Sequence, residues 1–431
     1  MRKHFSSILH LRQSEVVGNT AKLVSANVVA QAIALLIYPV LTRIYSPDDF
    51  GLFNLFLSIG GVIVIAANAE IQYSIVLPKS ERTAVACFHN GLSVVIGVTA
   101  VCMILLPLSD AIAGIFDVPQ LARWLPLMPL FVFVSSFWIL TNYWLTRNKQ
   151  FGQIATYQLS QSILGAGSKT GLGAAGLTGG GMIVGTIVAQ AVALAVTIKT
   201  SFKRCLKPLL HIDREECRAA ARQNVNFPKY DLPRAVIDNF SNNLPFFMLT
   251  PFFGLAEVGF LGMAFTLAMR PVTLVCNSLN QILYQKTAEQ VQNRLPISEV
   301  FSRFTRGSLL CLVPAFAALF LILPWLTECL LGSGWHVVGE YIRLMLPWVL
   351  MVWLTASVNY LPDVFQRQRG LLVFEVVHVL LRAVALSAGI VSGNFRLALT
   401  LYSAVGFVTL TVEYLWFRQI IVRYESQIVS S

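Results

Sequence analysis

The chain has 431 residues, of which 56% are hydrophobic and only 12% are charged, and its net charge is +11. Soluble domains usually contain about 25% charged residues, so this chain has too few to cover a water-facing surface of its size. Its apolar residues fall into repeated blocks of about 20, the length that an α-helix needs to cross the hydrocarbon core of a bilayer. The composition therefore excludes a soluble domain and predicts an all-α integral membrane protein. Such long apolar runs also argue against a transmembrane β-barrel.

Twelve apolar segments follow one another along the chain, and we predict that each forms a transmembrane helix. The segment at residues 152–173 has the weakest signal, because it holds several polar residues and Lys169 and so needs protection by neighbouring helices. The longest stretch between spans, residues 199–232, is too short for a folded domain. In chain order the predicted spans are 23–43, 51–71, 84–107, 124–145, 152–173, 177–198, 233–253, 257–283, 306–326, 341–361, 371–391 and 397–417.

The basic residues test the orientation of these spans. With the N-terminus in the cytoplasm, about 25 of the 32 Lys and Arg residues fall in cytoplasmic segments and about 4 on the opposite side, as the positive-inside rule requires. Adding or removing one early span would swap the sides of all later loops and destroy this bias, so we predict that both termini are cytoplasmic. The net charge is explained by this topology and by affinity for anionic membrane lipids, and we expect no nucleic-acid binding.

No motif for a metal, a cofactor or a catalytic group stands out. The seven cysteines are scattered at spacings that match no metal site, and we predict that they are small packing residues. The segment Gly171–Gly176 has the glycine spacing of a dinucleotide-binding loop, but it follows no strand and lies at a membrane span. Its glycines are expected to allow close helix packing instead. We therefore predict no cofactor, no metal site and no enzymatic activity.

The two halves of the chain resemble each other. When Gly51 is set against Gly259, Asp49 falls on Glu257, and in both copies an apolar span ends, a short acidic turn follows and a glycine opens the next span. Six spans separate the copies, which is typical of transporters built from two parallel repeats, and chance resemblance between apolar segments is the alternative. The predicted organisation is a six-helix lobe at residues 1–198, a cytoplasmic linker at 199–232 and a second six-helix lobe at 233–431.

Polar residues recur inside the predicted spans, although such groups are costly in lipid. They favour a hydrophilic cavity between the lobes, in which basic groups would meet phosphate oxygens and amides would meet sugar hydroxyls. Hydrogen bonding between helices, and mutual neutralisation of Glu375 and Arg382, are the alternatives. The candidate cavity residues are Lys169, Arg270, Arg382, Asn27, Gln31, Asn239, Asn242, Asn243, Asn277, Asn280 and Gln281. The candidate ion-coupling residues are Glu70, Asp238 and Glu375.

Several short stretches carry a family resemblance that extends over nearly the whole chain. They are Tyr38–Phe53 (YPVLTRIYSPDDFGLF), Asn226–Pro233 (NFPKYDLP), Phe253–Phe260 (FGLAEVGF), Arg270–Pro271 and Leu331–Trp335 (LGSGW). In their order and spacing the chain resembles the Wzx-type polysaccharide repeat-unit flippases. That family belongs to the multidrug/oligosaccharidyl-lipid/polysaccharide (MOP) exporter superfamily.

The resemblance implies two six-helix lobes around a central cavity. It implies transfer of an undecaprenyl-diphosphate-linked oligosaccharide from the cytoplasmic to the periplasmic leaflet of the bacterial inner membrane, by alternating access. The sugar would then be built into O-antigen, capsule or exopolysaccharide, with the polysaccharide polymerase machinery as an expected partner. These flippases share no dependable set of essential residues, so the resemblance gives no single residue a role.

Other functions remain alternatives. A drug/cation antiporter of the same superfamily predicts acidic coupling residues, for which Glu70 and Asp238 are candidates. A peptidoglycan-precursor flippase of that superfamily usually has a longer chain with extra spans. A membrane enzyme that polymerises or ligates glycans usually presents a large periplasmic loop, whereas the longest outer loops predicted here, residues 108–123 and 327–340, are short. A major-facilitator sugar transporter is disfavoured because residues 77–83 lack the Gly/Asp/Arg signature of that family.

Overall fold

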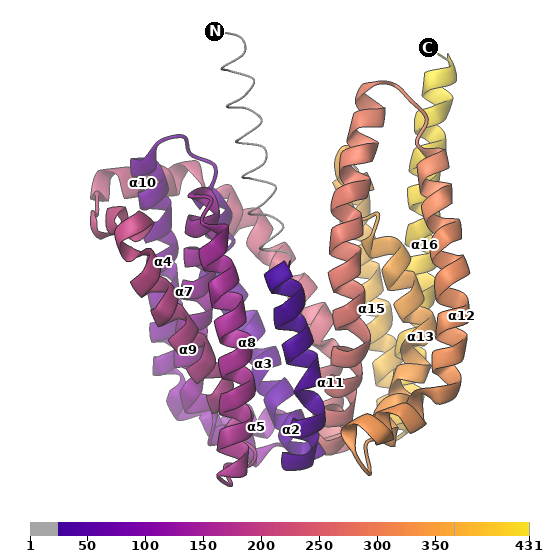
Figure 1. Ribbon diagram of the computed structural model, residues 1–431, viewed down its shortest axis with the longest axis horizontal. Helices are drawn as coiled ribbons and strands as arrows, with labels where there is room; N and C mark the ends of the chain where they lie inside the picture. The colour runs from indigo at the N-terminus through magenta and orange to yellow at the C-terminus, as the bar shows by residue number, and fades with distance from the viewer. Residues whose placement is uncertain (1–24, 366, 431) are drawn as a thin grey trace. The chain divides into compact units, whose positions relative to one another are not determined.

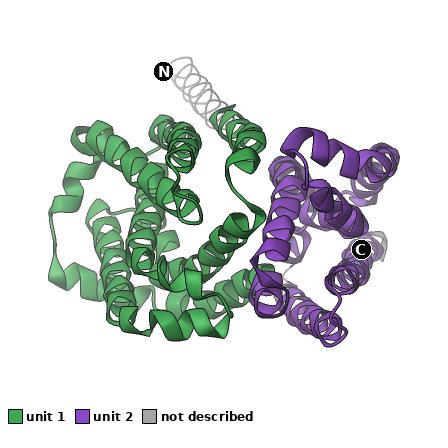
Figure 2. Cartoon of the chain, turned by 90° about the horizontal axis from the view of Figure 1, so that it is seen from below, with its two compact units in different colours: residues 1–243 green, residues 244–431 purple. Residues whose placement is uncertain are grey.

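The computed structural model describes residues 25–365 and 367–430, so the first 24 residues of the predicted N-terminal lobe lie outside the described part. All regular structure in these ranges is helical, which confirms the predicted all-α fold. The chain divides into two compact units, unit 1 up to Asn243 and unit 2 from Leu244 to Ser431 (Figure 2). This division falls within one helix, α11 (Leu232–Gln292), and the predicted lobe and linker boundaries stay a prediction.

Unit 1 is a bundle of long helices, with α8 against α9, and α4 and α3 each against α7 (Figure 1). A helical stretch at residues 25–36 leads into the first of its named helices. Shorter helices at its ends complete the unit. Its helices before α11 are α2 (Tyr38–Ile44), α3 (Pro47–Asn68), α4 (Glu81–Ile104), α5 (Ser109–Ile115), α6 (Pro119–Ala122), α7 (Met128–Arg147), α8 (Phe151–Ala174), α9 (Gly181–Ser201) and α10 (Arg214–Gln223).

Local sequence sets both ends of α3. The hydroxyl of Ser46 accepts a hydrogen bond from the backbone N–H of Asp49, and the Asp49 carboxylate accepts one from the backbone N–H of Ser46 at 2.9 Å. This reciprocal capping, with Pro47 in the first turn, satisfies N–H groups that a helix otherwise leaves without partners. At the other end Ala69 and Glu70 both adopt left-handed backbone conformations, with φ of 47° and 58°. The helix therefore ends at Asn68, slightly before the predicted end of the span at residue 71.

Glycines on α8 and α9 let neighbouring helices approach closely. A Cβ atom added at Gly173 would lie 2.5 Å from Ile44 Cγ2, and one added at Gly185 would lie 3.0 Å from the backbone nitrogen of Lys169. Within a bilayer the hydrophobic effect does not drive helices together, because lipid tails are as apolar as the side chains. Small residues instead let the helix backbones approach closely and gain van der Waals contacts. The contact at Gly173 agrees with the packing role that we predicted for the glycines of residues 171–176.

Unit 2 is a second helical bundle that begins in the middle of α11. Gly254 interrupts α11 with a φ of 81°, so the element is two helices joined by a kink, as the predicted spans at 233–253 and 257–283 require. Aromatic side chains from α11, α13 and α16 meet in its core, where the ring centroids of Trp348 and Tyr402 lie 5.5 Å apart. The other helices of unit 2 are α12 (Ser298–Leu331), α13 (His336–Ala356), α14 (Leu361–Val364), α15 (Gln368–Val391) and α16 (Phe395–Ser430).

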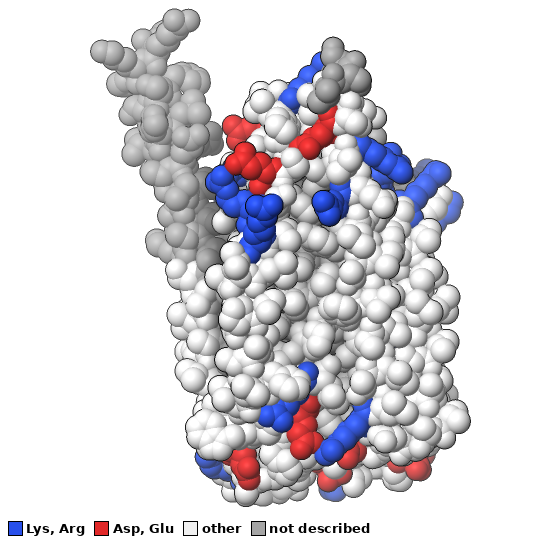
Figure 3. Space-filling view, turned by 90° about the vertical axis from the view of Figure 1, so that its right-hand side faces the viewer, with Lys and Arg blue, Asp and Glu red and all other residues white. Residues whose placement is uncertain are grey.

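The apolar helices support a multi-pass membrane protein. Among the described residues, ten helical segments are long and apolar enough to cross a bilayer. One of them, Phe227–Gln292, has 66 residues, enough for two crossings of about 20 residues each. The helix α8, which carries Lys169, is not among the ten, so the count of twelve stays a prediction. Figure 3 shows charged residues gathered toward the two ends of one face, with a broad band of uncharged residues between them.

We predict that unit 2 depends on close approach of α13 to α12 at Gly339. A Cβ added there would lie 2.6 Å from the carbonyl oxygen of Leu323 and 2.6 Å from the N and Cα atoms of Pro324. All three are backbone atoms, which cannot easily move aside. Overpacking of this kind costs about 1–3 kcal/mol, so Gly339→Ala is expected to lower the thermal unfolding midpoint in detergent. Gly307→Ala is the control, because a Cβ on Gly307 meets nothing within 4 Å and alanine favours a helix. Equal midpoints for the two variants would contradict the proposed close contact.

Candidate functional site

The first turns of α11, which belong to unit 1, are attached to α3 through asparagine side chains. The Asn243 side-chain oxygen accepts a hydrogen bond from the Ser58 hydroxyl at 2.8 Å. The Asn243 amide donates to the backbone oxygen of Asn239 at 2.9 Å and to its side-chain oxygen at 3.2 Å. Two of the candidate cavity residues, Asn239 and Asn243, thus make contacts within unit 1.

Four other candidate residues of unit 1 remain exposed. Asp238 and Asn242 are both exposed, and the Asn242 amide donates to the Asp238 carboxylate at 3.4 Å. Asn27 and Gln31 are also exposed, on the helical stretch at residues 25–36. These four side chains can therefore contact a ligand in this conformation without any rearrangement of the packed core.

Lys169 is half-buried in unit 1, where its ammonium group lies 4.8 Å from the centre of the Phe53 ring. A cation over an aromatic face is stabilised by the ring quadrupole. The backbone oxygen of Lys169 also accepts a hydrogen bond from the Tyr45 hydroxyl at 2.7 Å. Burial, with a smaller contribution from Asp49, raises the pKa of Tyr45 to about 12, so this hydroxyl keeps its proton and remains a donor. Lys169 thus takes part in the packing of α8 against its neighbours.

Glu70 lies just beyond the end of α3, in a buried position with 9% of its surface exposed. The amide of Gln72 donates to its carboxylate at 3.3 Å. Burial raises the pKa of the Glu70 carboxyl above its usual range, the Gln72 hydrogen bond lowers it, and nearby Asp231 and Arg234 act in opposite directions. A buried carboxylate with a raised pKa can take up a proton, which agrees with its prediction as an ion-coupling candidate but does not test it.

Arg147 holds the loop that follows Glu70, a role that the sequence analysis missed. Its guanidinium donates to the backbone oxygens of Ile75 at 3.2 Å, Pro78 at 2.5 Å and Ser80 at 3.2 Å. Five N–H donors in a planar fork allow one arginine to satisfy several carbonyls at once. The sequence marked Arg147 only as a cytoplasmic cation, because the carbonyls that it binds carry no signal in the amino-acid pattern.

Arg382 of α15 is enclosed in the core of unit 2, with 3% of its surface exposed. Its guanidinium lies 4.5 Å from the centre of the Trp348 ring and 4.2 Å from that of Tyr402, and it donates to the Tyr402 hydroxyl at 2.9 Å. Its Nε and Nη2 atoms have no acceptor among the described residues. Arg382 is thus held by aromatic rings, and its assignment to a binding cavity stays a prediction.

Arg270 differs from Arg382 in its surroundings. It lies on the part of α11 that belongs to unit 2 and is half-buried. None of the described residues gives its side chain a hydrogen bond, an ion pair or a ring contact, whereas its backbone oxygen accepts from the Thr273 hydroxyl. An unneutralised guanidinium inside a membrane span is costly, and such groups are usually functional.

The remaining candidates of unit 2 fall into two groups. Asn280 donates to the backbone oxygen of Ala356 at 3.0 Å and so joins α11 to α13, whereas Asn277 is exposed. The side chain of Gln281 lies outside the described part of the structure. Glu375 is half-buried on α15 and interacts electrostatically with Glu413 of α16, a second carboxylate that the sequence analysis did not single out.

The fold is shared with solved transporters. The lipid II flippase MurJ, in an inward closed conformation, gives a TM-score of 0.72 at 10% identity, with 94% of this chain and 90% of that chain covered. An inward-facing multidrug resistance MATE family transporter of the MOP superfamily gives 0.65 at 14% identity, with 92% and 96% covered. A mutant of the Vibrio cholerae MATE transporter VcmN gives 0.60 at 13% identity, with 95% and 97% covered. At such low identity these likenesses show the fold.

Sequence comparison identifies the family. No curated protein sequence matches the chain. Residues 40–340, well over half of the chain, match the family described as "Polysaccharide biosynthesis protein". The chain therefore belongs to this polysaccharide biosynthesis protein family, and it has the flippase-like fold of the MOP superfamily.

Proposed function

We propose that this protein is a flippase that moves undecaprenyl-diphosphate-linked oligosaccharide repeat units from the cytoplasmic to the periplasmic leaflet of the bacterial inner membrane. The transferred units would serve the biosynthesis of O-antigen, capsule or exopolysaccharide. Membership of a polysaccharide biosynthesis family supports a saccharide substrate, and the fold shared with a lipid II flippase supports a lipid-linked one. Transfer by alternating access, in which the polar groups open first to one side of the membrane and then to the other, requires no chemical step and no cofactor.

The observation that carries the proposal is the half-buried Arg270, whose side chain has no partner among the residues that the structure describes. A diphosphate headgroup brings negative charge and many acceptor oxygens into the membrane, and a guanidinium fork can bind two such oxygens together. Substrate that neutralises Arg270 would remove the cost of leaving this charge unpaired. Within the same unit, the exposed amide of Asn277 is suited to sugar hydroxyls, whose orientation varies among repeat units. Lys169 and Arg382 are already engaged by aromatic rings, and in our proposal they hold the helices that carry the binding groups.

A multidrug/cation antiporter is the second candidate. It is favoured by the structural likeness to MATE transporters and by the carboxylates of Glu375 and Glu413, which lie close enough to interact. A cationic drug would be repelled by the charge of Arg270, which has no partner among the described residues. The two functions predict opposite effects of removing Arg270: loss of transport for an anionic lipid-linked sugar, and little change or a gain for a cation.

Transport should depend on the guanidinium of Arg270. We expect that the purified protein in proteoliposomes moves a lipid-linked oligosaccharide to the opposite leaflet, where a lectin added on that side can bind the sugar. The Arg270→Gln variant should transfer the oligosaccharide more slowly. Charge-assisted hydrogen bonds contribute about 1.5–3 kcal/mol, so the rate at limiting substrate should fall by about tenfold or more. Arg270→Lys should restore only part of it, because lysine keeps the charge without the planar fork.

The matched control is Arg306→Gln, which removes the same charge from an exposed position on α12 of the same unit. It should leave both transfer and protein level unchanged. Transfer by Arg270→Gln at the wild-type rate, or an equal loss in both variants, would refute the role of Arg270. Absence of any transfer by the wild-type protein, together with normal surface polysaccharide in a deletion strain, would count against a flippase altogether.

The proposed orientation can be tested by cysteine labelling. In a background without the seven native cysteines, Lys207→Cys should react with a membrane-impermeant maleimide only from the cytoplasmic side, because its segment holds many of the basic residues. Ser333→Cys should react only from the periplasmic side. Both native side chains are exposed, so a lack of access would reflect the membrane and not burial. If each cysteine were labelled only from the other side, the predicted topology would be wrong and the proposed direction of transfer would be reversed.

A further inference from the structure

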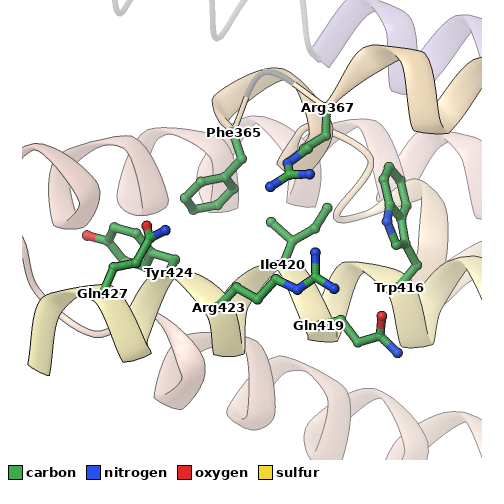
Figure 4. A pocket seen from close by; sticks show the side chains of 8 residues that line it. All are labelled: Phe365, Arg367, Trp416, Gln419, Ile420, Arg423, Tyr424 and Gln427. Carbon is green, nitrogen blue, oxygen red and sulfur yellow. The ribbon is translucent and has the colours of Figure 1, made fainter. Parts of the chain in front are cut away.

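A small pocket lies at the end of unit 2 where α16 meets the loop before α15 (Figure 4). Its volume is about 170 Å³. One part of the wall comes from α16 and the other from the loop, so the pocket joins residues that are far apart in the sequence. Its lining consists of Phe365, Arg367, Trp416, Gln419, Ile420, Arg423, Tyr424 and Gln427.

Two unneutralised arginines give this pocket its charge. Arg367 reaches it from the loop and Arg423 from α16 (Figure 4). No described residue forms a hydrogen bond or an ion pair with either guanidinium, and no carboxylate lines the pocket. The neighbouring Glu425 is engaged elsewhere, because its carboxylate accepts hydrogen bonds from the backbone N–H groups of Ile297 at 2.9 Å and Ser298 at 2.8 Å. The pocket therefore presents free donors and net positive charge.

The walls of the pocket are held in place by aromatic packing. The rings of Phe365 and Tyr424 lie 5.2 Å apart, and those of Trp416 and Phe374 also lie 5.2 Å apart. Gly370 makes room for Trp416, because a Cβ added there would lie 2.5 Å from the indole. A site whose walls are already packed loses little conformational entropy when a ligand binds.

The start of α15 adds to the attraction for an anion. Arg367 is the residue that caps this helix, and the first turn of α15 contains no acidic residue. The amino end of a helix carries partial positive charge, which an acidic side chain or a bound anion stabilises. Here the first turn of α15 has no carboxylate and Arg367 stands at its start, so a bound anion would be stabilised at this helix end.

The length of α16 indicates the depth of the pocket in the membrane. This helix has 36 residues, and at 1.5 Å per residue it is about 54 Å long, against about 30 Å of hydrocarbon. If the hydrocarbon is crossed at the predicted span, residues 397–417, then residues 419–427 would lie at the level of the lipid headgroups. Tryptophan and tyrosine side chains such as Trp416 and Tyr424 are typical of this boundary.

We propose that this pocket binds the phosphate group of an anionic lipid. A volume of about 170 Å³ is several times that of a water molecule, at about 30 Å³, but below the roughly 300 Å³ of the smallest sites for drug-sized ligands. It therefore suits a phosphate with its adjoining ester and excludes an oligosaccharide. Arg367 and Arg423 bind the phosphate oxygens, Gln419 donates a further hydrogen bond, and the aromatic walls contact the apolar part of the lipid. Either a phospholipid or an isoprenoid diphosphate carries this chemistry.

The test is thermal unfolding of the full, delipidated chain in a neutral detergent, titrated with four probes. They are dioleoylphosphatidylglycerol, the zwitterionic dioleoylphosphatidylcholine, farnesyl diphosphate and sodium phosphate at constant ionic strength. We expect phosphatidylglycerol or farnesyl diphosphate to raise the unfolding midpoint, and phosphatidylcholine to raise it far less. The double variant Arg367→Gln/Arg423→Gln should keep the ligand-free midpoint, because both side chains are exposed. Its apparent affinity should fall by about tenfold or more.

Arg418→Gln is the matched control, because Arg418 is an exposed cation on the same helix outside the pocket. It should bind the probes like the wild type. Whichever probe depends most strongly on Arg367 and Arg423 identifies the source of the phosphate, and a response to sodium phosphate alone would assign a soluble anion and overturn the lipid. Equal losses in the control and the double variant, or no response to any probe, would overturn the site. Binding that is lost in Arg270→Gln but kept in the double variant would belong to the proposed transport site instead.

Discussion

The cost of leaving a charge unpaired within the membrane is the constraint on which the arrangement of polar groups in this protein depends. Arg382 meets it inside unit 2 through the rings of Trp348 and Tyr402. Lys169 meets it inside unit 1 through the ring of Phe53. Arg270 has no such partner among the described residues, although it lies on a membrane helix. The same physical rule therefore separates cations that stabilise a bundle from one that remains available to an anionic ligand.

Most of the fold could be predicted because its determinants are local. Apolar runs of about 20 residues fix the long helices, and at two of their boundaries local backbone chemistry sets the end. The Ser46–Asp49 pair caps the start of α3, and Gly254 provides the left-handed conformation that divides α11 where two spans were predicted. Even the weakest predicted span, 152–173, is a continuous helix, α8, because contacts with its neighbours compensate for its polar residues.

The contacts of the polar residues could be predicted much less well, since the sequence of a membrane helix does not show which way the helix is rotated. Lipid and protein core are both apolar, so the hydrophobic pattern does not separate the two sides. Asn242 and Asn243 of α11 were both predicted to line a cavity, but Asn243 accepts a hydrogen bond from Ser58 whereas Asn242 is exposed. The pocket was missed for a different reason. Gln419, Arg423 and Gln427 form an i, i+4, i+8 stripe that the sequence does contain, but Arg367 joins them only through the fold.

The surroundings of the arginines indicate that the positive charge of the chain does more than set its orientation in the membrane. Arg147 binds loop carbonyls, Arg303 pairs with Glu299 and Arg396 with Glu340, so each is satisfied within its own unit. Cations retained only for orientation would need no particular surroundings, since the positive-inside effect depends on where they are along the chain. The two arginines of the α16 pocket instead share packed aromatic walls and no carboxylate, as a phosphate site requires. Orientation explains how many cations there are, and the proposed ligand binding would explain why these two have no partner among the described residues.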